Sequence, residues 1–381
     1  MLPRQVDVVV VGGGPTGLVL TATLQQAGHT VLGVDRQEEG ANTSRAAAIH
    51  AHTLQALNEL DVTEALIDEG VVVPVFTVRD RDRILAQLEF GSLPTPYPFV
   101  LTLPQDRTEA ILTERLRRLG GAIQRPYRVT GVFVEPDGAV VGVDGPGGAQ
   151  AVRARYVVGA DGSHSVVRES LGINFSGGNY AQAFLLGDVR VDWPLRRDEV
   201  QNFFSPDGIV VSAPLPDDQR RVVATVDKPP RTITAEYIQE ILDTRGPAGA
   251  HVRTLEWSSQ FRVQHRIADT FRAGPVFLAG DAAHVHSPAG GQGMNLGIQD
   301  ALDLGHTLAA SLDGVEAIDL DGYERRRRPI AKATVRFTDI MTRASIITNR
   351  PGRRLRNAAL TALGHLPPAR RQMAKYMAQL A

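Results

Sequence analysis

The chain contains no cysteine among its 381 residues. Disulfides, thiolate catalysis, cysteine-ligated metals and thioether-linked cofactors are therefore excluded, and we predict no metal site. Neither sign of charge is in excess, because 41 lysines and arginines stand against 42 aspartates and glutamates. A net charge of −1 gives no electrostatic reason to expect binding to nucleic acid or to a membrane surface. No stretch approaches the roughly 18 consecutive apolar residues of a membrane span, so we expect a cytoplasmic protein.

The N-terminal segment "VDVVVVGGGPTGLVLTATLQQAGHTVLGVDR" has the pattern of a compact βαβ unit. Val6–Val11 is a continuous β-branched run, which is typical of a strand buried on both faces and too short for a secretory signal. Gly12, Gly14 and Gly17 follow with G-x-G-x-x-G spacing. The first glycine permits a tight turn, the second lets a pyrophosphate approach the backbone, and the third lets helix and strand pack closely. The pattern predicts a dinucleotide-binding loop.

The same unit continues with a predicted helix, Leu18–Gln26, which ends at a C-cap near Gly28. A second predicted strand, Thr30–Val34, leads to Asp35. A carboxylate at that strand tip can accept hydrogen bonds from the ribose hydroxyls of an adenosine. The loop alone does not distinguish NAD from FAD. A ligand-free α/β turn is the less favoured interpretation, because strand, glycines, helix and acid all occur in order.

The next segment, "NTSRAAAIHAHTLQALNELDVTEALI", predicts a helix with leucines 54, 57 and 60 on one face. Arg45 precedes it in a stretch of small residues, and position alone favours a solvated surface arginine. His50 and His52 lie near the predicted helix start, where histidines are more often structural than catalytic.

The middle of the chain is predicted to hold a helix and a β-meander. Pro94–Gln105 is interrupted by prolines and is not expected to form a regular central strand. A helix is predicted from a cap at Asp106 or Thr108 to about Leu119. Short strands with turns at 136–138 and 145–148 then lead to an apolar strand at 156–159 and the stretch "ADGSHSVVRESLG".

Residues 182–263 alternate in polarity, with a hairpin turn predicted at 206–208, and indicate an antiparallel sheet in a separate domain. A buried parallel strand is expected at Val276–Ala279, followed by a glycine-rich loop, and the chain beyond Asp303 is predicted to be mostly helical. The run Arg325–Arg328 is interpreted as a solvated helix face.

Three stretches occur in order: "GGGPTG", "GADGSHSVVR" and "FLAGDAAHVHSPAGGQGMNLGIQDALDLG". Together with "LPQDRTEAILTERL" and "YERRRRPIA", this set resembles the class A FAD-dependent monooxygenases, the family of para-hydroxybenzoate hydroxylase, phenol hydroxylase and the aromatic polyketide hydroxylases. The chain is similar to a short form without the thioredoxin-like C-terminal domain that many of these enzymes carry.

The resemblance implies an α/β fold with an α+β second domain. A Rossmann-like FAD-binding domain is expected from residues 1–175 and 270–345, with 72–100 contributing to the substrate side. An inserted antiparallel-sheet substrate domain is expected at 176–269, and a C-terminal helical segment at 346–381. FAD would be bound non-covalently, with the first loop on the pyrophosphate and Asp281 on the ribityl or pyrophosphate region.

The helix starting near Gly293–Asn295 would direct its amide groups at the ring, because free amides at a helix N-terminus stabilise the negative charge of a reduced flavin. Asp161 and Arg168 match a motif associated with FAD and with docking of the nicotinamide. The cofactor-binding residues implied by the resemblance are Gly12, Gly14, Pro15, Thr16, Gly17, Asp35, Arg36, Arg45, Gln105, Val129, Asp161, Gly280, Asp281, Pro288, Gly291, Gly293, Met294 and Asn295.

The implied reaction transfers one oxygen atom from O2 to an electron-rich aromatic carbon through a flavin hydroperoxide. NADPH or NADH would act as a transient co-substrate, because the chain has no second Rossmann unit. No catalytic base is assigned; His50, His286 and Tyr180 are weak candidates. Apolar residues of the predicted sheet indicate a hydrophobic pocket for a phenol or a polycyclic aromatic substrate: Phe203, Phe204, Val211 and Pro214.

Other chemistries on the same fold stay open, namely an oxidase or a reductase of isoprenoid double bonds, as does FAD binding without turnover. A flavin halogenase is disfavoured, because Trp193 and Trp257 are isolated and neither fits a W-x-W-x-I-P stretch. The expected partner is a small aromatic molecule, with no nucleic acid and no membrane, and the chain is expected to be a monomer or homodimer.

Overall fold

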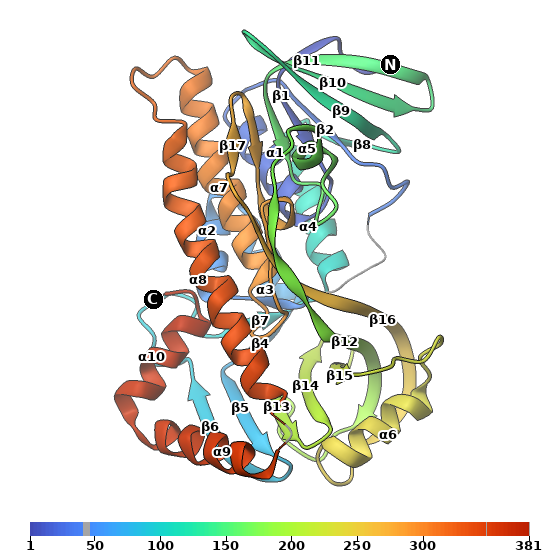
Figure 1. Cartoon of the computed structure of the whole chain (residues 1–381), viewed down its shortest axis with the longest axis vertical. Coiled ribbons are helices and arrows are strands. Elements are labelled where there is room, and N and C mark those ends of the chain that lie inside the picture. Colours follow the sequence, from blue (N-terminus) through green and yellow to red (C-terminus); the bar gives the residue numbers. More distant parts are fainter. Residues whose placement is uncertain (41–45, 348, 381) are drawn as a thin grey trace.

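The computed structural model describes residues 1–40, 46–347 and 349–380. Two eight-stranded sheets lie at opposite ends of the molecule, and long helices run beside them (Figure 1). Strands β12 and β16 pass between the two ends, and the long orange-red helix α8 (Asp321–Ser345) descends along one side toward the second sheet, where the last two helices lie (Figure 1). The mixed α/β fold class predicted from the sequence is confirmed.

The first sheet has the order β17-β18-β11-β1-β2-β8, and β9 and β10 continue it beside β11. β1 pairs in parallel with β2 and β11, and β11 pairs in parallel with β18. Val8, Val9 and Val10 of β1 are fully buried, as the β-branched run predicts. The strands are β1 Gln5–Val11, β2 Val31–Val34, β8 Ile123–Gln124, β9 Arg128–Glu135, β10 Gly138–Gly145, β11 Gly148–Gly159, β17 Arg272–Ala273 and β18 Val276–Leu278.

Helices α1 (Pro15–Gln26) and α7 (Gly293–Leu312) pack closely against one another. A Cβ on Gly297 would lie 2.4 Å from the Thr16 hydroxyl, and one on Gly305 would lie 2.7 Å from the side chain of Thr23. Glycines on α7 therefore bring the two glycine-rich loops together at one end of this helix pair. The other helices near the first sheet are α2 Ala51–Leu57, η1 Asn58–Leu60, α3 Thr63–Glu69, α4 Gln105–Arg118 and α5 Val166–Ser170.

A small sheet of three strands, β3 (Ala48–Ile49), β7 (Val100–Thr102) and β4 (Val71–Val73), lies in the order β3-β7-β4. The prediction that Pro94–Gln105 contains no central strand was wrong, since β7 is the middle strand. The strand is possible because its three residues lie between Pro98 and Pro104 and include no proline. Proline disfavours a central strand only where it stands within the strand, since it has no N–H to donate to the neighbouring strand.

The second sheet has the order β19-β16-β12-β15-β14-β13-β5-β6. It is antiparallel except that β13 pairs in parallel with β5, so a segment far earlier in the chain extends it. Helix α6 (Ala235–Arg245) lies within the region predicted to be strands alone. The strands are β5 Val75–Asp80, β6 Arg83–Glu89, β12 Phe175–Asp192, β13 Glu199–Ser205, β14 Gly208–Leu215, β15 Gln219–Val226, β16 His251–Ala268 and β19 His284–Val285.

The C-terminal part is helical, as predicted, and consists of α8 (Asp321–Ser345), α9 (Arg350–His365) and α10 (Pro367–Met377). α9 and α10 pack against β6 of the second sheet. The short η2 (Gly280–Ala282) precedes β19 and α7. Across residues 1–40, 46–347 and 349–380, we find no helix with the length and apolar character needed to cross a membrane.

Candidate active site

A cavity of about 930 Å³ lies where the two glycine-rich loops meet the second sheet. One part of its wall comes from the first glycine-rich loop, residues 12–17, and from residues 160–164, which we call the DG stretch. Another part comes from the segment 285–294, which contains the second glycine-rich loop. The rest is formed by the three-stranded sheet, the second sheet, α8 and α10; most of these side chains are apolar, and the polar ones include Asn202, Arg262 and Gln264. Predicted cofactor residues on the wall are Gly14, Pro15, Thr16, Arg36, Gln105, Asp161, Asp281, Pro288, Gly291, Gly293 and Met294.

The three glycines of the first loop have different surroundings. Gly12 has a left-handed φ of 112°, and a Cβ there would lie 2.2 Å from the Ala160 carbonyl oxygen. A Cβ on Gly17 would lie 1.8 Å from the carbonyl oxygen of Gly12. A Cβ on Gly14, in contrast, would have no described atom within 4 Å. Gly12 and Gly17 thus serve packing, whereas Gly14 leaves room on the cavity side for a ligand.

Gly14 is also the N-cap of α1, with Pro15 at the first helical position, and none of the described side chains caps this terminus. The first amides of a helix lack intrahelical acceptors and, with the helix dipole, favour a bound anion. An open backbone position in front of such a terminus fits a pyrophosphate group.

Asp35 follows β2 and is connected to the first loop. Its carboxylate accepts a hydrogen bond from the Gly13 amide at 2.6 Å and pairs with Arg125 at 3.2 Å. Arg125 also donates to the Gly13 carbonyl at 2.9 Å. Asp35 is absent from the residues that line the cavity, and its ribose contact stays a prediction. Arg125 was missed by the sequence analysis, because its partners are 86 or more positions away.

Asp161 lies on the cavity wall at the start of the DG stretch. One carboxylate oxygen accepts a hydrogen bond from the Val167 amide at 3.3 Å. The other is buried and has no hydrogen-bond partner within the described chain. Burial raises the pKa of Asp161, although hydrogen bonds from Ser165 and nearby amides oppose this effect. A buried acceptor without a partner fits a ligand that donates a hydrogen bond.

Arg168 is only 5% exposed, and its guanidinium donates to the carbonyls of Ala282 and Ser163 at 2.9 and 2.8 Å. The side chain also lies over the ring of Phe175 at 4.0 Å. These contacts connect the DG stretch to η2. Docking of the nicotinamide by Arg168 stays a prediction, while its burial favours a role in positioning these two segments.

Asn295 holds the second loop against β3. Its side-chain amide donates to the carbonyls of Ala48 and Gly291 at 2.8 and 2.9 Å, and its oxygen accepts from the His50 amide at 2.8 Å. The backbone between them turns through Gly290 and Gly291, with φ of 81° and 64°. Both glycines use a left-handed conformation that other residues rarely adopt. The Asn295 side chain therefore stabilises a loop whose two glycines would otherwise allow many backbone conformations.

His50 and His286 both line the cavity near this loop. Nε2–H of His50 donates to the carbonyl of Gly290, and Nδ1–H of His286 donates to that of Ser287, each at 2.9 Å. Burial lowers the pKa of each imidazole to about 4. Both rings are therefore neutral near pH 7. Their opposite nitrogens, which carry the lone pairs, are buried and find no hydrogen-bond partner among the described residues.

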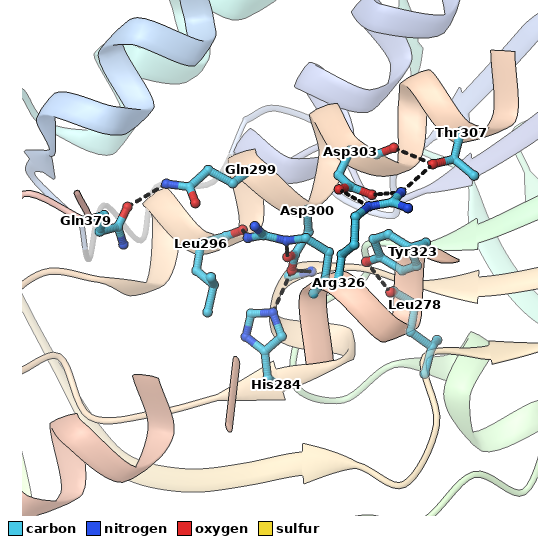
Figure 2. A network of polar contacts seen from close by, with 12 residues as sticks. Leu278, His284, Leu296, Gln299, Asp300, Asp303, Thr307, Tyr323, Arg326 and Gln379 are labelled. Carbon is cyan, nitrogen blue, oxygen red and sulfur yellow. Dashed lines mark hydrogen bonds and ion pairs between the residues drawn. The ribbon is translucent and has the colours of Figure 1, made fainter. Parts of the chain in front are cut away.

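A buried ionic network surrounds Asp300 of α7, the helix that follows the second loop (Figure 2). Asp300 of α7 accepts hydrogen bonds from His284 Nε2 and Arg327 Nε at 2.6 Å each, and from the Gly280 amide at 3.2 Å. Burial would raise the pKa of Asp300, but the charges and hydrogen bonds of Arg327 and His284 lower it to about 2. The network connects η2, β19, α7 and α8.

The same network corrects the prediction for Arg325–Arg328. Arg327 is only 6% exposed, and its guanidinium also donates to the Leu296 carbonyl at 3.3 Å. Arg326 pairs with Asp303 at the surface (Figure 2). A helix face rich in arginine therefore includes one residue that points inward, because a buried carboxylate is available there to offset its charge.

Gln105 and Arg221 stabilise the edge of the site near residue 46. Gln105 accepts a hydrogen bond from the Ala46 amide at 3.3 Å and donates to Glu109 at 2.8 Å. Arg221, buried on β15, forms a two-pronged ion pair with Asp188 at 2.7 Å and donates to the Ala46 carbonyl at 2.9 Å. Sequence analysis missed this arginine, since nothing in the strand pattern marks it. Arg45 lies outside the described residues.

The second sheet presents alternate residues of β13 to the cavity. Val200, Asn202 and Phe204 line it, whereas Phe203 is fully buried on the opposite face, where its ring contacts Trp193. Successive side chains of a strand point to opposite faces, so the two phenylalanines cannot share one pocket. The expectation that Phe203 lines the pocket was wrong. Val211 lines the cavity, and Pro214 is absent from its wall.

The remaining predicted residues lie away from the cavity wall. Tyr180 donates to Asp339 at 2.7 Å, and burial together with this hydrogen bond raises its pKa, which disfavours a role as a base. Five more of the predicted cofactor residues are absent from the wall, namely Gly12, Gly17, Val129, Gly280 and Asn295.

In the part of the chain that the structure describes, no three histidine or acidic side chains form a group that could hold a metal ion.

Comparison with known proteins connects this site to flavin chemistry. A family model described as "FAD binding domain" matches residues 5–338. A 12-dehydrotetracycline 5-monooxygenase/anhydrotetracycline 6-monooxygenase from Streptomyces rimosus subsp. rimosus is 35% identical, over 98% of this chain and 76% of that protein.

Two solved structures are similar along most of their length. The p-nitrophenol 4-monooxygenase of Pseudomonas putida is 26% identical, with a TM-score of 0.89 and 99% of both chains covered. An aklavinone-11 hydroxylase in a ternary complex with FAD and aklavinone is 28% identical, with a TM-score of 0.80 over 92% of this chain and 71% of that one.

Proposed function

The chain belongs to the FAD binding domain family and is a flavin-dependent aromatic monooxygenase, and from that premise we propose that its substrate is an extended, largely apolar aromatic molecule. The observation that carries this proposal is the composition of the cavity, where both glycine-rich loops meet a wall of apolar side chains. The aromatic rings on that wall belong to Phe76, Phe90, Phe184, Phe204, Phe261 and Phe337.

We assign the binding of FAD to the polar part of the cavity. The amides at the start of α1 and the open position at Gly14 would hold the pyrophosphate, and Asp161 would accept a hydrogen bond from the cofactor. The backbone of Gly291 and Gly293 and the N-terminus of α7 would face the ring. When bound and reduced by NADPH or NADH, FAD supplies activated molecular oxygen to the cavity.

The apolar part would position the substrate and exclude water. Asn202 lies there with a side-chain oxygen that is buried and lacks a hydrogen-bond partner in the described structure. We propose that the Asn202 oxygen accepts a hydrogen bond from a hydroxyl group of the substrate and so orients it, because a few polar groups in an apolar pocket fix the direction of a ligand. The unprotonated ring nitrogens of His50 and His286 can accept a hydrogen bond from a phenolic hydroxyl near pH 7, but the pKa of about 4 disfavours either ring as a base that takes the phenolic proton.

The experiment that tests this function uses ¹⁸O2 and a panel of phenols, naphthols and polycyclic phenols. We expect one labelled oxygen atom in the product of at least one polycyclic phenol, and at least tenfold faster anaerobic flavin reduction when that substrate is present. Fast reduction without any ligand, with no label in any product, would instead favour an oxidase or a reductase.

A pair of variants tests the pocket itself. Phe204→Ala should change substrate preference or increase release of hydrogen peroxide, with little change in FAD affinity, because this ring faces the cavity. Phe133→Ala is the control, since that ring is 67% exposed on β9 of the other sheet. Equal effects of the two substitutions on substrate preference would contradict the assignment.

A further inference from the structure

The last turn of the described chain lies beside both the cavity and the second loop. α10 ends at Met377, whose side chain lines the cavity. Gln379 follows two residues later with a left-handed φ of 59°, which directs the chain back toward α7. This turn therefore lies against the apolar part of the cavity through Met377 and against the start of α7 through Gln379.

Three glutamines connect this turn to α7, and we call Gln292, Gln299 and Gln379 the glutamine clasp. Gln292, the N-cap of α7, is 3% exposed, and its oxygen accepts a hydrogen bond from Gln379 Nε2. Gln299 donates to the side-chain oxygen of Gln379 at 2.6 Å (Figure 2). Gln379 is thus held between the first residue before α7 and its second turn.

Backbone contacts reinforce the clasp. The side-chain nitrogen of Gln292 lies 3.4 Å from the carbonyl oxygens of both Gly290 and Met377. The His52 amide donates to the Ala378 carbonyl at 3.3 Å. Gln292 therefore contacts the flexible glycine backbone of the second loop with the same amide group that contacts the end of α10.

A glutamine amide both donates and accepts, so one residue can connect two elements only while its geometry is kept. The loop 290–293 contains two glycines in left-handed conformations and depends on side-chain contacts for its position. Displacement of Met377 by a ligand would move the turn that holds Gln379, and with it the contact to Gln292.

We propose that the glutamine clasp couples occupancy of the aromatic cavity to the position of the loop 290–293, with Gln379 as a positioning residue and Met377 as a determinant of substrate specificity. The inference rests on the proposed function for the identity of the two ligands. Its structural part, that Gln379 holds the loop, requires neither ligand.

Hydrogen exchange tests the structural part in protein without FAD. Gln379→Ala should raise the exchange rate of the amides of residues 290–296 at least fivefold, because Gln292 loses its partner. Gln372→Ala, at an exposed glutamine of the same helix, should leave those rates unchanged. Gln379→Glu retains an acceptor for Gln299 but has no N–H to donate to the Gln292 oxygen, so exchange at 290–296 should rise as in Gln379→Ala. Unchanged exchange at 290–296 in Gln379→Ala would overturn the proposal.

Coupling is tested in the FAD-loaded protein. Gln379→Ala should increase peroxide formation without substrate at least threefold, and should reduce the acceleration of flavin reduction by substrate. Met377→Ala should change KM for the aromatic substrate, whereas Met373→Ala, which packs on β6 and is absent from the cavity wall, should not. The effect of Gln292→Ala combined with Gln379→Ala should be smaller than the sum of the two single effects, because both variants remove the contact between Gln292 and Gln379.

A lower Tm of Gln379→Ala with unchanged exchange and peroxide formation would mean that the turn only anchors the chain, and would overturn the coupling. A wild-type protein that hydroxylates no aromatic compound would refute the proposed function instead. Because exchange is measured without FAD or substrate, the two failures are distinguishable.

Discussion

Two glycine-rich loops reach the same cavity, but they are held in place by different means. The first loop lies between β1 and α1, and its shape depends mainly on close backbone contacts such as that of Gly17 with Gly12, to which Asp35 and Arg125 add side-chain contacts at Gly13 alone. The second loop is held by side chains from distant parts of the chain, among them His50 and Gln379, and Arg327 holds the following helix α7 through Asp300. The difference separates a locally encoded binding element from one that depends on the assembled fold.

This contrast explains how one chain can bind a long cofactor and still move part of it. A loop fixed by its own backbone gives a rigid seat for the pyrophosphate. A loop held by a set of side-chain contacts can shift when one contact changes, because each hydrogen bond contributes only about 1 kcal/mol. We expect the rigid function at Gly12–Gly17 and the mobile function at Gly290–Gly293.

The largest effect should come from Asp300 in the buried ionic network of α7. Asp300→Ala leaves Arg327 buried without its partner, which should lower the free energy of unfolding by about 3–5 kcal/mol. Urea unfolding measures this loss. The control is Asp303→Ala, because its pair with Arg326 is partly exposed and should contribute at most about 1 kcal/mol. Similar losses in both variants would mean that the network does not hold the loop.

The pH dependence of stability tests whether the ionised carboxylate of Asp300 stabilises the folded chain. The pKa of Asp300 is lowered to about 2 in the folded chain, below its ordinary value. A group with a lowered pKa in the folded state stabilises above its unfolded pKa and loses that effect as the pH falls. The difference in stability between the wild-type chain and Asp300→Asn should therefore narrow between about pH 4 and pH 2. A constant difference over this range would contradict the ionised state of Asp300.

A smaller effect on stability is expected from the glycines of the first loop, because Gly17 serves packing whereas Gly14 serves FAD binding. Gly17→Ala places a Cβ against a carbonyl oxygen and should destabilise the protein by about 1–3 kcal/mol. Gly14→Ala meets no described atom within 4 Å, so the stability of the FAD-free protein should change by less than about 0.5 kcal/mol. Its affinity for FAD should fall at least about tenfold, or 1.4 kcal/mol. Thermal unfolding and FAD titration of both variants check this division.

The same contrast explains what the sequence could predict. β1, the three spaced glycines, the hairpin turn at 206–208 and the start of α7 at Gly293 follow from local pattern, and the structure confirms them. The spacing of buried Ile238, Ile241 and Leu242 also marks α6 as a helix, although the strands on either side concealed it.

The residues that were missed or misassigned depend on distant partners. Arg327 is buried because it forms an ion pair with Asp300, and nothing in a run of four arginines indicates that pairing. Phe203 and Phe204 differ only in strand face, which the register of the sheet decides. Arg125 reaches Asp35 through a contact between distant segments, which a single sequence does not reveal.

The central claim is that both loops hold a single molecule of FAD. The direct measurement is the flavin content of the purified chain, determined by acid precipitation, together with FAD titration of Gly14→Ala and Asp281→Ala. Asp281 lies on the cavity wall beside the second loop, and Asp303→Ala serves as its control. We predict one FAD per chain, released fully into the supernatant, and at least tenfold weaker binding in each loop variant. FMN in place of FAD, flavin retained in the pellet, or unchanged affinity in Asp281→Ala would contradict the claim.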